Sequence, residues 1–270
     1  MNTKQKIALV TGASSGIGEA TAQQLALAGY RVYGTSRRGG QVAQRAFQML
    51  ALDVTQDASV DAAVRQLIQL EGRIDLLVNN AGFGVAAAAA EESSMAQAQA
   101  IFDTNFFGMV RMTRAVVPHM RRQKSGRIIN IGSVLGFLPM PYMALYSATK
   151  HAVAGYSESL DHELRTQGIR VSVVEPAYIN TPFDANQVPP DAPLDVYREI
   201  RAGVEKRVKE VLVGADGPGV VADTVLQAAA ATQPKLRYAP GLARRMRLLR
   251  RFAPASVLDA GVRKDLRLAA

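Results

Sequence analysis

The chain is predicted to fold as an α/β protein with a single doubly wound parallel sheet of about seven strands, helices on both faces and a basic C-terminal helical extension. Three observations lead to this prediction. Short apolar runs alternate with helical stretches along most of the 270 residues. A glycine-rich turn follows the first apolar run. The sequence has no internal repeat and no interdomain linker, so we assign residues 1–240 to one domain and residues 241–270 to the extension.

The first strand is expected at residues 7–10, a short apolar run typical of a buried parallel strand. Residues 16–28 are predicted to form the first helix, with Gly29 at its C-cap. Between them, Thr-Gly-Ala-Ser-Ser-Gly-Ile-Gly spaces three glycines as Gly-x-x-x-Gly-x-Gly. A strand, a glycine turn and a helix in this order predict a dinucleotide site, with the pyrophosphate on the helix N-terminus. The expected contacts are Gly12, Ser14, Ser15, Gly16, Ile17 and Gly18.

The second strand, residues 31–36, ends in Ser36-Arg37-Arg38 without an acidic residue. An acidic side chain at this place binds the adenosine ribose hydroxyl of NAD, whereas an arginine accommodates the 2′-phosphate of NADP. Ser36 offers a hydroxyl, and Arg37 can form two parallel hydrogen bonds with a phosphate. We therefore predict NADP(H), bound by Ser36, Arg37 and Arg38; the alternative is a solvated basic turn.

The remaining elements follow from hydrophobic periodicity. Residues 95–122 are expected to form one long helix, with Pro118 near its end as a kink or stop. A short irregular link replaces a helix between the second and third strands. The other predicted strands are residues 48–54, 74–79, 127–131, 169–175 and 236–238, and the other predicted helices are residues 58–70, 144–166, 194–209 and 220–231.

Tyr146 and Lys150 stand four residues apart in one predicted helix, and Ser133 lies 13 residues before Tyr146. Positions i and i+4 share one helix face, so the ammonium would lie beside the phenol and lower its pKa from about 10. The three side chains predict a proton donor or acceptor with a hydroxyl that holds the reacting group. The spacing alone is also typical of a solvated helix face, and the glycine motif is what favours the catalytic interpretation.

From residue 5 to about residue 185, the chain resembles the short-chain dehydrogenase/reductase family. The resemblance rests on the glycine turn at residues 11–18, on Asn-Asn-Ala-Gly at residues 79–82, on Asn105 and on the serine, tyrosine and lysine just described, all in the family's order. Less specific segments, such as Val-Glu-Pro-Ala-Tyr at residues 174–178, resemble the corresponding segments of the branch that contains 17β-hydroxysteroid and retinol dehydrogenases. The resemblance implies a Rossmann-type sheet and hydride transfer between a nicotinamide and a carbonyl or alcohol carbon.

The same resemblance implies a role for each site residue. Tyr146 would exchange the proton, Ser133 would hydrogen-bond the substrate oxygen, and Lys150 would lower the tyrosine pKa and bind the nicotinamide ribose. Asn105 would organise a water that links Lys150 to solvent, although an amide bonded to the backbone is the alternative. The family usually has glycine where Ala177 stands, so a glycine-only backbone angle is not expected there. The further cofactor contacts that it implies are Asp53, Val54, Asn80, Ala81, Gly82, Pro176, Ala177, Ile179 and Thr181.

No charged residue occurs between Ser133 and Lys150, and most side chains in this stretch are apolar. This favours a bulky apolar substrate such as a steroid, a retinoid or an aliphatic ketone or aldehyde, although core packing or a subunit interface explains the same side chains. Residues 183–213 would form the substrate loop. The expected pocket residues are Phe83, Leu135, Phe137, Met140, Met143, Tyr178 and Phe183. Two other functions stay open: a 3-oxoacyl-carrier-protein reductase, and a nucleotide-sensing regulator without catalysis.

Composition limits the partners. The chain has no cysteine, which excludes disulfides and cysteine-bound metals, and its three scattered histidines predict no metal site. A polar N-terminus without room for a signal peptide and the lack of a long apolar run favour the cytoplasm. The net charge of +9 comes mainly from residues 235–270, which carry +8, so it does not indicate nucleic-acid binding. We also expect a homo-oligomer that acts on a small apolar carbonyl or alcohol.

The extension has the pattern of a basic amphipathic helix that Pro254 interrupts. Apolar residues at spacings of three and four would share one side of it, and arginines would occupy the rest. These apolar residues are Leu242, Met246, Leu249 and Ala253. We expect the helix to pack on its own domain as one wall of the substrate cleft. Contact with an anionic membrane is the less favoured alternative, because the apolar side is short.

Overall fold

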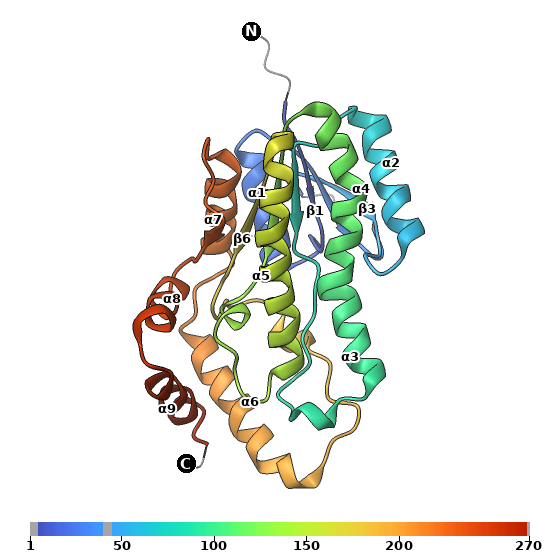
Figure 1. Ribbon diagram of the computed structural model, residues 1–270. Coiled ribbons are helices and arrows are strands. Elements are labelled where there is room, and N and C mark those ends of the chain that lie inside the picture. Colours follow the sequence, from blue (N-terminus) through green and yellow to red (C-terminus); the bar gives the residue numbers. More distant parts are fainter. Residues whose placement is uncertain (1–4, 40–44, 269–270) are drawn as a thin grey trace.

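The computed structural model describes residues 5–39 and 45–268. Seven parallel strands form one sheet in the order β3-β2-β1-β4-β5-β6-β7, which confirms the predicted doubly wound sheet (Figure 1). The chain begins near the middle of the sheet and adds strands first to one side and then to the other. The strands are β1 (Ile7–Val10), β2 (Arg31–Ser36), β3 (Gln48–Ala51), β4 (Leu76–Asn79), β5 (Gly126–Ile131), β6 (Ile169–Val174) and β7 (Arg237–Tyr238).

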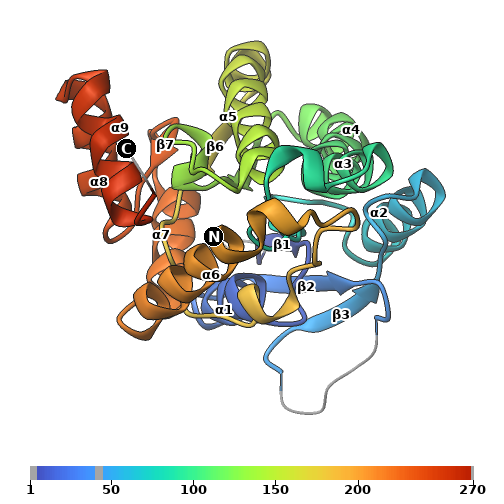
Figure 2. The same ribbon diagram turned by 90° about the horizontal axis from the view of Figure 1, so that it is seen from below.

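Helices cover both faces of this sheet, as the view in Figure 2 shows. α1 and α7 pack on one face, and α2, α4 and α5 pack on the other. In the described residues, no helix is both long and apolar enough to span a membrane. The helices are α1 (Gly16–Leu27), α2 (Asp57–Glu71), α3 (Met95–Phe102), α4 (Gly108–Gln123), α5 (Ala144–Leu164), α6 (Arg198–Val213), α7 (Gly219–Ala230), α8 (Ala243–Phe252) and α9 (Ala255–Asp265).

Successive side chains of the strands enter opposite cores, because the side chains of a strand alternate in direction. Leu9 of β1 packs in the core beneath α2, α4 and α5, whereas Ala8 and Val10 pack against α1 and α7. All four residues of β1 are buried. A parallel strand covered on both faces therefore appears in the sequence as an unbroken apolar run.

The helix predicted for residues 95–122 is interrupted. A π-helical turn at Asp103–Phe107 separates α3 from α4, and Asn105 lies in this turn. Pro118 does not end α4, which continues for five further residues. Met120 in the last turn is fully buried, so the packing of this turn outweighs the hydrogen bond that proline removes.

Other bounds differ from the prediction by a few residues. β3 ends at Ala51 rather than at residue 54, because the N–H of Asp53 donates to Ser59 Oγ (3.0 Å) instead of continuing the ladder. α6 begins at Arg198, after a short 3₁₀ turn, and therefore starts four residues later than expected. Part of the predicted irregular link, residues 40–44, lies outside the described residues.

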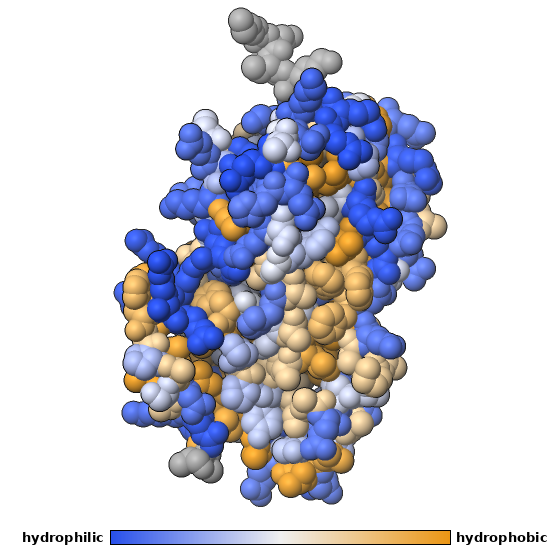
Figure 3. Space-filling view, in the orientation of Figure 1, coloured by the Kyte–Doolittle hydropathy of each residue, from blue (hydrophilic) through white to orange (hydrophobic). Residues whose placement is uncertain are grey.

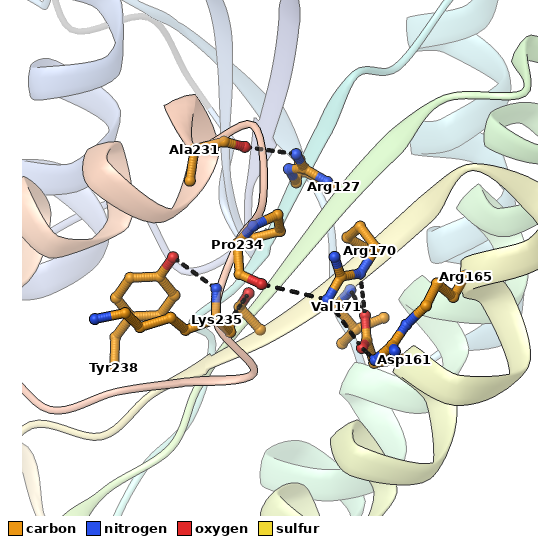
Figure 4. A network of polar contacts seen from close by, with 10 residues as sticks. Arg127, Asp161, Arg165, Arg170, Val171, Ala231, Pro234, Lys235 and Tyr238 are labelled. Carbon is orange, nitrogen blue, oxygen red and sulfur yellow. Dashed lines mark hydrogen bonds and ion pairs between the residues drawn. The ribbon is translucent and has the colours of Figure 1, made fainter.

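A polar network ties the edge of the sheet to α5 (Figure 4). Asp161 is fully buried and accepts hydrogen bonds from Arg165 (2.5 Å), from Arg170 (2.9 Å) and from the N–H of Val171 (2.9 Å). Arg170 also donates to the carbonyl oxygen of Pro234 (3.3 Å), just before β7. Burial raises the pKa of Asp161, but the hydrogen bonds from Arg170, Val171 and Arg165 outweigh it and lower this pKa to about 2. The network therefore holds the last strand of the sheet in place.

Candidate active site

The loops at the carboxyl ends of the strands border one cleft with a volume of about 1330 Å³. It extends from the glycine turn after β1 to α6, α8 and α9. A doubly wound sheet binds its ligands at this edge, because the strand order reverses there and leaves a crevice. Within the described residues, no three His, Asp or Glu side chains are grouped so as to hold a metal ion.

The glycine turn has the backbone that the motif requires. Gly12 and Gly16 have φ angles of +64° and +59°, in the left-handed region that favours glycine. A Cβ on Gly18 would lie 2.3 Å from the carbonyl oxygen of Gly12. The side-chain amide of Asn80 donates to the carbonyl oxygens of Thr11 (3.0 Å) and Gly12 (3.1 Å), so the end of β4 holds the turn in place. The turn residues that line the cleft are Gly12, Ser14, Ser15, Gly16 and Ile17, while Gly18 is buried behind them.

Ser36, Arg37 and Arg38 line the cleft beyond the glycine turn. Both arginines are exposed, and neither forms an ion pair with another described residue. Asp53 and Val54 border the cleft from the adjacent end of β3. Hydrogen bonds from Thr55 lower the pKa of Asp53 despite its partial burial, and the charge of Arg37 acts in the same direction. This end of the cleft therefore holds two unpaired guanidinium groups opposite an ionised carboxylate.

Arg45 also contacts the glycine turn, which no sequence pattern indicated. Its Nη2 donates to the carbonyl oxygen of Ser14 (2.8 Å), and its Nε donates to Glu19 of α1 (3.0 Å). The guanidinium also lies 5.5 Å from the centre of the Phe47 ring. Arg45 thus supports the turn from the side. Nothing in an irregular link marks such a residue in advance.

Ser133, Tyr146 and Lys150 meet on one wall of the cleft. Tyr146 and Lys150 lie one turn apart near the start of α5, and Nζ of Lys150 is 5.5 Å from the centre of the tyrosine ring. This Nζ donates to the carbonyl oxygen of Ile131 (2.9 Å) at the end of β5. Ser133 follows β5, and its hydroxyl accepts the N–H of Leu135 (3.1 Å). The end of β5 and the first turns of α5 therefore bring the three side chains together.

The pKa of Tyr146 moves opposite to the predicted direction. Burial raises it, the charge of Asp184 raises it further, and the Ser133 hydroxyl acts in the opposite sense. Burial also lowers the pKa of Lys150 to about 8. The predicted lowering by Lys150 is not found, because the ammonium lies over the ring and bonds to a carbonyl oxygen while burial disfavours a phenolate. A neutral phenol at physiological pH is the form that can donate a proton.

Asn105 holds the chain that follows β4. Its side-chain oxygen accepts the N–H of Phe83 (2.9 Å), and its side-chain nitrogen donates to the carbonyl oxygen of Phe83 (2.8 Å). It also borders a small internal cavity of about 10 Å³, which Lys150 and Asn79 line as well. A cavity of this size accommodates about one water molecule. Asn105 therefore bonds to the backbone of Phe83 and also lines the small cavity that borders Lys150.

The segment after β6 borders the cleft between the glycine turn and the side chains of Ser133, Tyr146 and Lys150. A Cβ on Gly16 would lie 3.4 Å from Cβ of Thr181, so this segment contacts the turn closely. Ala177 does not have a positive φ, as expected from its side chain. The cofactor candidates that line this part of the cleft are Asn80, Ala81, Gly82, Pro176, Ala177, Ile179 and Thr181.

The far half of the cleft is mainly apolar. Phe137, which was predicted to border the pocket, is not among the residues that line it, and its carbonyl oxygen accepts a hydrogen bond from Arg250 Nε (3.0 Å). The predicted pocket residues that line the cleft are Phe83, Leu135, Met140, Met143, Tyr178 and Phe183. Sequence reasoning missed Asp184 and Gln187 of the loop, and most of the lining from α6, α8 and α9. The apolar lining residues from α6, α8, α9 and the C-cap of α9 include Val208, Leu212, Met246, Leu249, Val257, Leu258, Val262 and Leu266.

Ion pairs attach the last two helices to the domain. Arg247 of α8 pairs with Glu175 (2.7 Å) at the end of β6, and Asp265 of α9 pairs with Arg207 (2.6 Å) of α6. Figure 3 shows hydrophilic and hydrophobic residues interleaved over α8 and α9, at the lower left. The exposed apolar side chains of this surface are Leu242, Leu248, Leu249, Phe252 and Val257.

Known proteins resemble this chain in sequence. Residues 6–191 match the family model described as short chain dehydrogenase. A protein from Bacteroides thetaiotaomicron named 3-ketodihydrosphingosine reductase is 46% identical over 185 residues, which are 67% of this chain and 67% of that protein. YbbO, an uncharacterized oxidoreductase of Escherichia coli, is 34% identical over 262 residues, which cover 94% of this chain and 93% of YbbO.

Solved structures agree with these matches. A short-chain dehydrogenase from Streptomyces avermitilis has a TM-score of 0.81 at 32% identity, and the match covers 98% of this chain and 96% of that one. A serine dehydrogenase complexed with NADP+ has a TM-score of 0.74 at 28% identity, and the match covers 86% of this chain and 93% of that one. A short chain dehydrogenase/reductase from Burkholderia phymatum in complex with NAD has a TM-score of 0.77 at 28% identity, with 92% and 94% covered. With its family model matched over most of its length, this chain belongs to the short-chain dehydrogenase/reductase family of oxidoreductases.

Proposed function

We propose that the protein is an NADP(H)-dependent oxidoreductase that reduces the carbonyl group of a bulky apolar substrate. The observation that carries this proposal is the convergence of Ser133, Tyr146 and Lys150 on the wall of one cleft, between a glycine turn and an apolar half. A regulator that only senses a nucleotide needs no proton donor beside an apolar binding surface. The assignment to the 17β-hydroxysteroid and retinol branch stays a prediction.

The chain fits a dinucleotide. The glycine turn leads into the N-terminus of α1, the kind of place where a pyrophosphate binds. A side chain on Gly12 would collide with Ala81, and one on Gly18 would collide with Gly12, so the turn could not keep this shape. Arg37 and Arg38 are exposed and unpaired among the described residues, which supports a 2′-phosphate at the end of β2. Bound NADPH supplies the hydride. The segment from Pro176 to Thr181 would hold the nicotinamide end.

Side chains of the protein would then transfer the proton that the reduction requires. Tyr146, kept neutral by burial, would donate its proton to the carbonyl oxygen of the substrate as the hydride reaches the carbon. Ser133 would hydrogen-bond the same oxygen and stabilise its developing negative charge. Lys150, whose pKa is lowered to about 8, would attract the tyrosinate that forms and supply a proton through the small cavity beside Asn105.

The apolar half of the cleft supports a substrate with a long alkyl chain. Aliphatic side chains from α6, α8 and α9 line it, and the Bacteroides relative is named for a ketone derived from dihydrosphingosine, an alkyl-chain compound. We therefore place long-chain aliphatic ketones before steroids and retinoids. Residues 1–240 would form the catalytic domain, with residues 183–213 as its substrate loop and residues 241–270 as an extension packed on it.

A spectrophotometric screen tests this proposal. The purified protein should consume NADPH in the presence of apolar ketones, more rapidly with longer chains, and should use NADH less well. Thioesters of an acyl-carrier protein form a second arm, because the basic extension could bind an acidic carrier. Turnover of the thioesters alone would favour the 3-oxoacyl-carrier-protein reductase. Nucleotide binding without turnover of any carbonyl compound would favour the regulator and contradict the proposal.

A further inference from the structure

Asp184 is a charged side chain in the apolar half of the cleft, close to the proton donor. It follows Phe183, whose ring centre lies 5.8 Å from the centre of the Tyr146 ring. Asp184 and Tyr146 both line the cleft, and the charge of Asp184 is one of the causes that raise the pKa of Tyr146. The carboxylate is therefore near the place where the substrate carbonyl must bind.

The loop that carries Asp184 is fixed to the domain. The N–H of Val188 donates to the carbonyl oxygen of Gly84 (2.9 Å), and the N–H of Ala86 donates to the carbonyl oxygen of Val188 (2.8 Å). A Cβ on Gly84 would lie 3.2 Å from Cζ of Phe183, so glycine allows this ring to approach the backbone after β4. The carboxylate thus has a defined position relative to Tyr146.

The carboxylate of Asp184 has no cationic partner among the described residues. Its side-chain oxygen Oδ1 instead accepts a hydrogen bond from a neutral group, Nε2 of Gln187 (3.0 Å). Burial raises the pKa of Asp184, as expected for a carboxylate that is taken from water without compensation. The remaining charged side chains of the cleft are Arg37, Arg38 and Asp53 at the adenosine end, Lys150 behind Tyr146, and Glu205, Lys209 and Asp265 on α6 and α9.

A structural role accounts for part of this arrangement. Asp184 begins a short 3₁₀ turn, which the N–H of Gln187 closes on the carbonyl oxygen of Asp184 (3.4 Å), and the side-chain bond from Gln187 spans the same turn. An asparagine oxygen would accept the same hydrogen bond without burying a charge, and asparagine serves such turns as aspartate does. The turn therefore does not explain why a carboxylate lies beside the proton donor in a mainly apolar part of the cleft.

We infer that Asp184 binds an ammonium group that the substrate carries next to its carbonyl, so that amino ketones with a long alkyl chain are the preferred substrates. This inference rests on the carbonyl-reductase function proposed above. Because Asp184 directly follows Phe183, whose ring packs against Tyr146, we place the amine within a few bonds of the carbonyl carbon. An ion pair is stronger in an apolar cleft than in water, and a bound ammonium would offset the cost of burying the carboxylate.

A matched pair of ketones tests the inference. One is a straight-chain α-amino ketone of about twelve carbons, and the other is the same ketone without the amine. The unmodified protein should favour the amino ketone by about ten-fold or more in kcat/KM. Asp184→Asn should remove this preference, because kcat/KM for the amino ketone should fall about ten-fold more than kcat/KM for the plain ketone. Asp195→Asn, at an exposed carboxylate in the same loop region, should behave like the unmodified protein.

Binding supplies a measurement that does not depend on turnover. A straight-chain alkylamine of similar length should compete with the plain ketone, and Asp184→Asn should weaken this inhibition by about ten-fold or more. Equal loss on both ketones, or an unchanged preference for the amine, would overturn the inference while the reductase function stands. Turnover of neither ketone by the unmodified protein would overturn the proposed function and the inference together.

Discussion

Glu175 and Arg247 join the end of β6 to the first helix of the extension: Nη1 of Arg247 lies 2.7 Å from Oε2 of Glu175, whose side chain is 1% exposed. Arg237 contacts the other carboxylate oxygen of Glu175. The residues that follow Glu175 form the cleft wall proposed to hold the nicotinamide, and α8 forms part of the apolar wall. One buried carboxylate thus connects the cofactor side of the cleft with its substrate side.

Arg247→Ala should therefore weaken substrate binding more than catalysis. The loss of this pair frees α8 at one of its attachment points, so we expect KM for a long-chain ketone to rise several-fold while kcat changes by less than about two-fold. Steady-state kinetics measure both. Arg245→Ala provides the matched control, because Arg245 is exposed on the same helix. A large fall in kcat with unchanged KM would contradict the proposed role of this contact.

Tyr146→Phe should abolish turnover and leave NADPH affinity within a few-fold, because the hydroxyl is needed for the proton and not for the nucleotide. Fluorescence titration with NADPH measures the binding. Tyr156→Phe, on the same helix but in the core beneath it, should remain active. The proposed chemistry is wrong if Tyr146→Phe turns over ketone at a near-normal rate.

Arg37→Asp should shift the cofactor preference toward NAD(H). A carboxylate at this position accepts hydrogen bonds from a free ribose hydroxyl and repels a 2′-phosphate. Calorimetric titration should show tighter NADPH than NADH binding for the unmodified protein and the reverse order, or equal affinities, for the variant. Arg65→Asp, an exposed charge reversal on α2, should leave the order unchanged. Tighter NADH binding by the unmodified protein would refute the cofactor assignment.

Asp161 should make the fold sensitive to acid. Its pKa is lowered from 3.8 to about 2 in the folded state, so the stabilisation is fully present above pH about 4 and is lost as the pH falls through about 2. The shift corresponds to about 2 kcal/mol. Asp161→Asn should lower the free energy of unfolding at pH 7 by about 3 kcal/mol and flatten its decline between pH 4 and 2.

Urea unfolding at several pH values measures this effect, with Asp61→Asn as a control because Asp61 is exposed on α2. Parallel stability curves for Asp161→Asn and the unmodified protein would show that Asp161 does not carry the acid dependence.

The basic surface of α8 and α9 should bind anionic liposomes at low salt and release them at physiological salt. Its apolar side chains partly line the cleft, so charge would carry most of the attraction, and salt screens charge. Sedimentation at two salt concentrations tests this expectation. Reversing Arg244 and Arg245 to glutamate should remove the low-salt binding, whereas reversing Arg65 and Arg121 should not. Binding that survives physiological salt would favour membrane attachment.

Much of the fold and of the site could be predicted from local sequence signals. The order of apolar runs indicated the sheet. The spacing of Gly12, Gly16 and Gly18 indicated the tight turn, in which each of them has a backbone angle or a close contact that requires glycine. Ser133, Tyr146 and Lys150 were found because their spacing is fixed by one strand end and one helix. These features depend on short stretches of chain, so they can be recognised in the sequence without knowledge of the tertiary structure.

Other features depend on which distant segments meet. In the sequence, Asp184 looks like any solvated carboxylate of a loop. Only the tertiary structure brings its loop to the cleft that Tyr146 also lines. Phe137 was assigned to the pocket by polarity alone, but the residues that line the cleft on either side of it are Leu135 and Leu138, and Phe137 itself does not line the cleft. The direction of the Tyr146 pKa was wrong because burial, which no spacing encodes, outweighs the neighbouring ammonium.

The far wall of the cleft comes from residues beyond the stretch that matches the family model, which ends at residue 191. The fit of the distant end of the substrate would therefore depend on a part of the chain that lies outside the residues proposed for the hydride chemistry. Mutation can reshape α8 and α9, and so alter the length or shape of the molecule that fits, without disturbing the proton relay. Exchange of the last thirty or so residues between homologues is thus a practical route for redirecting this scaffold to new substrates.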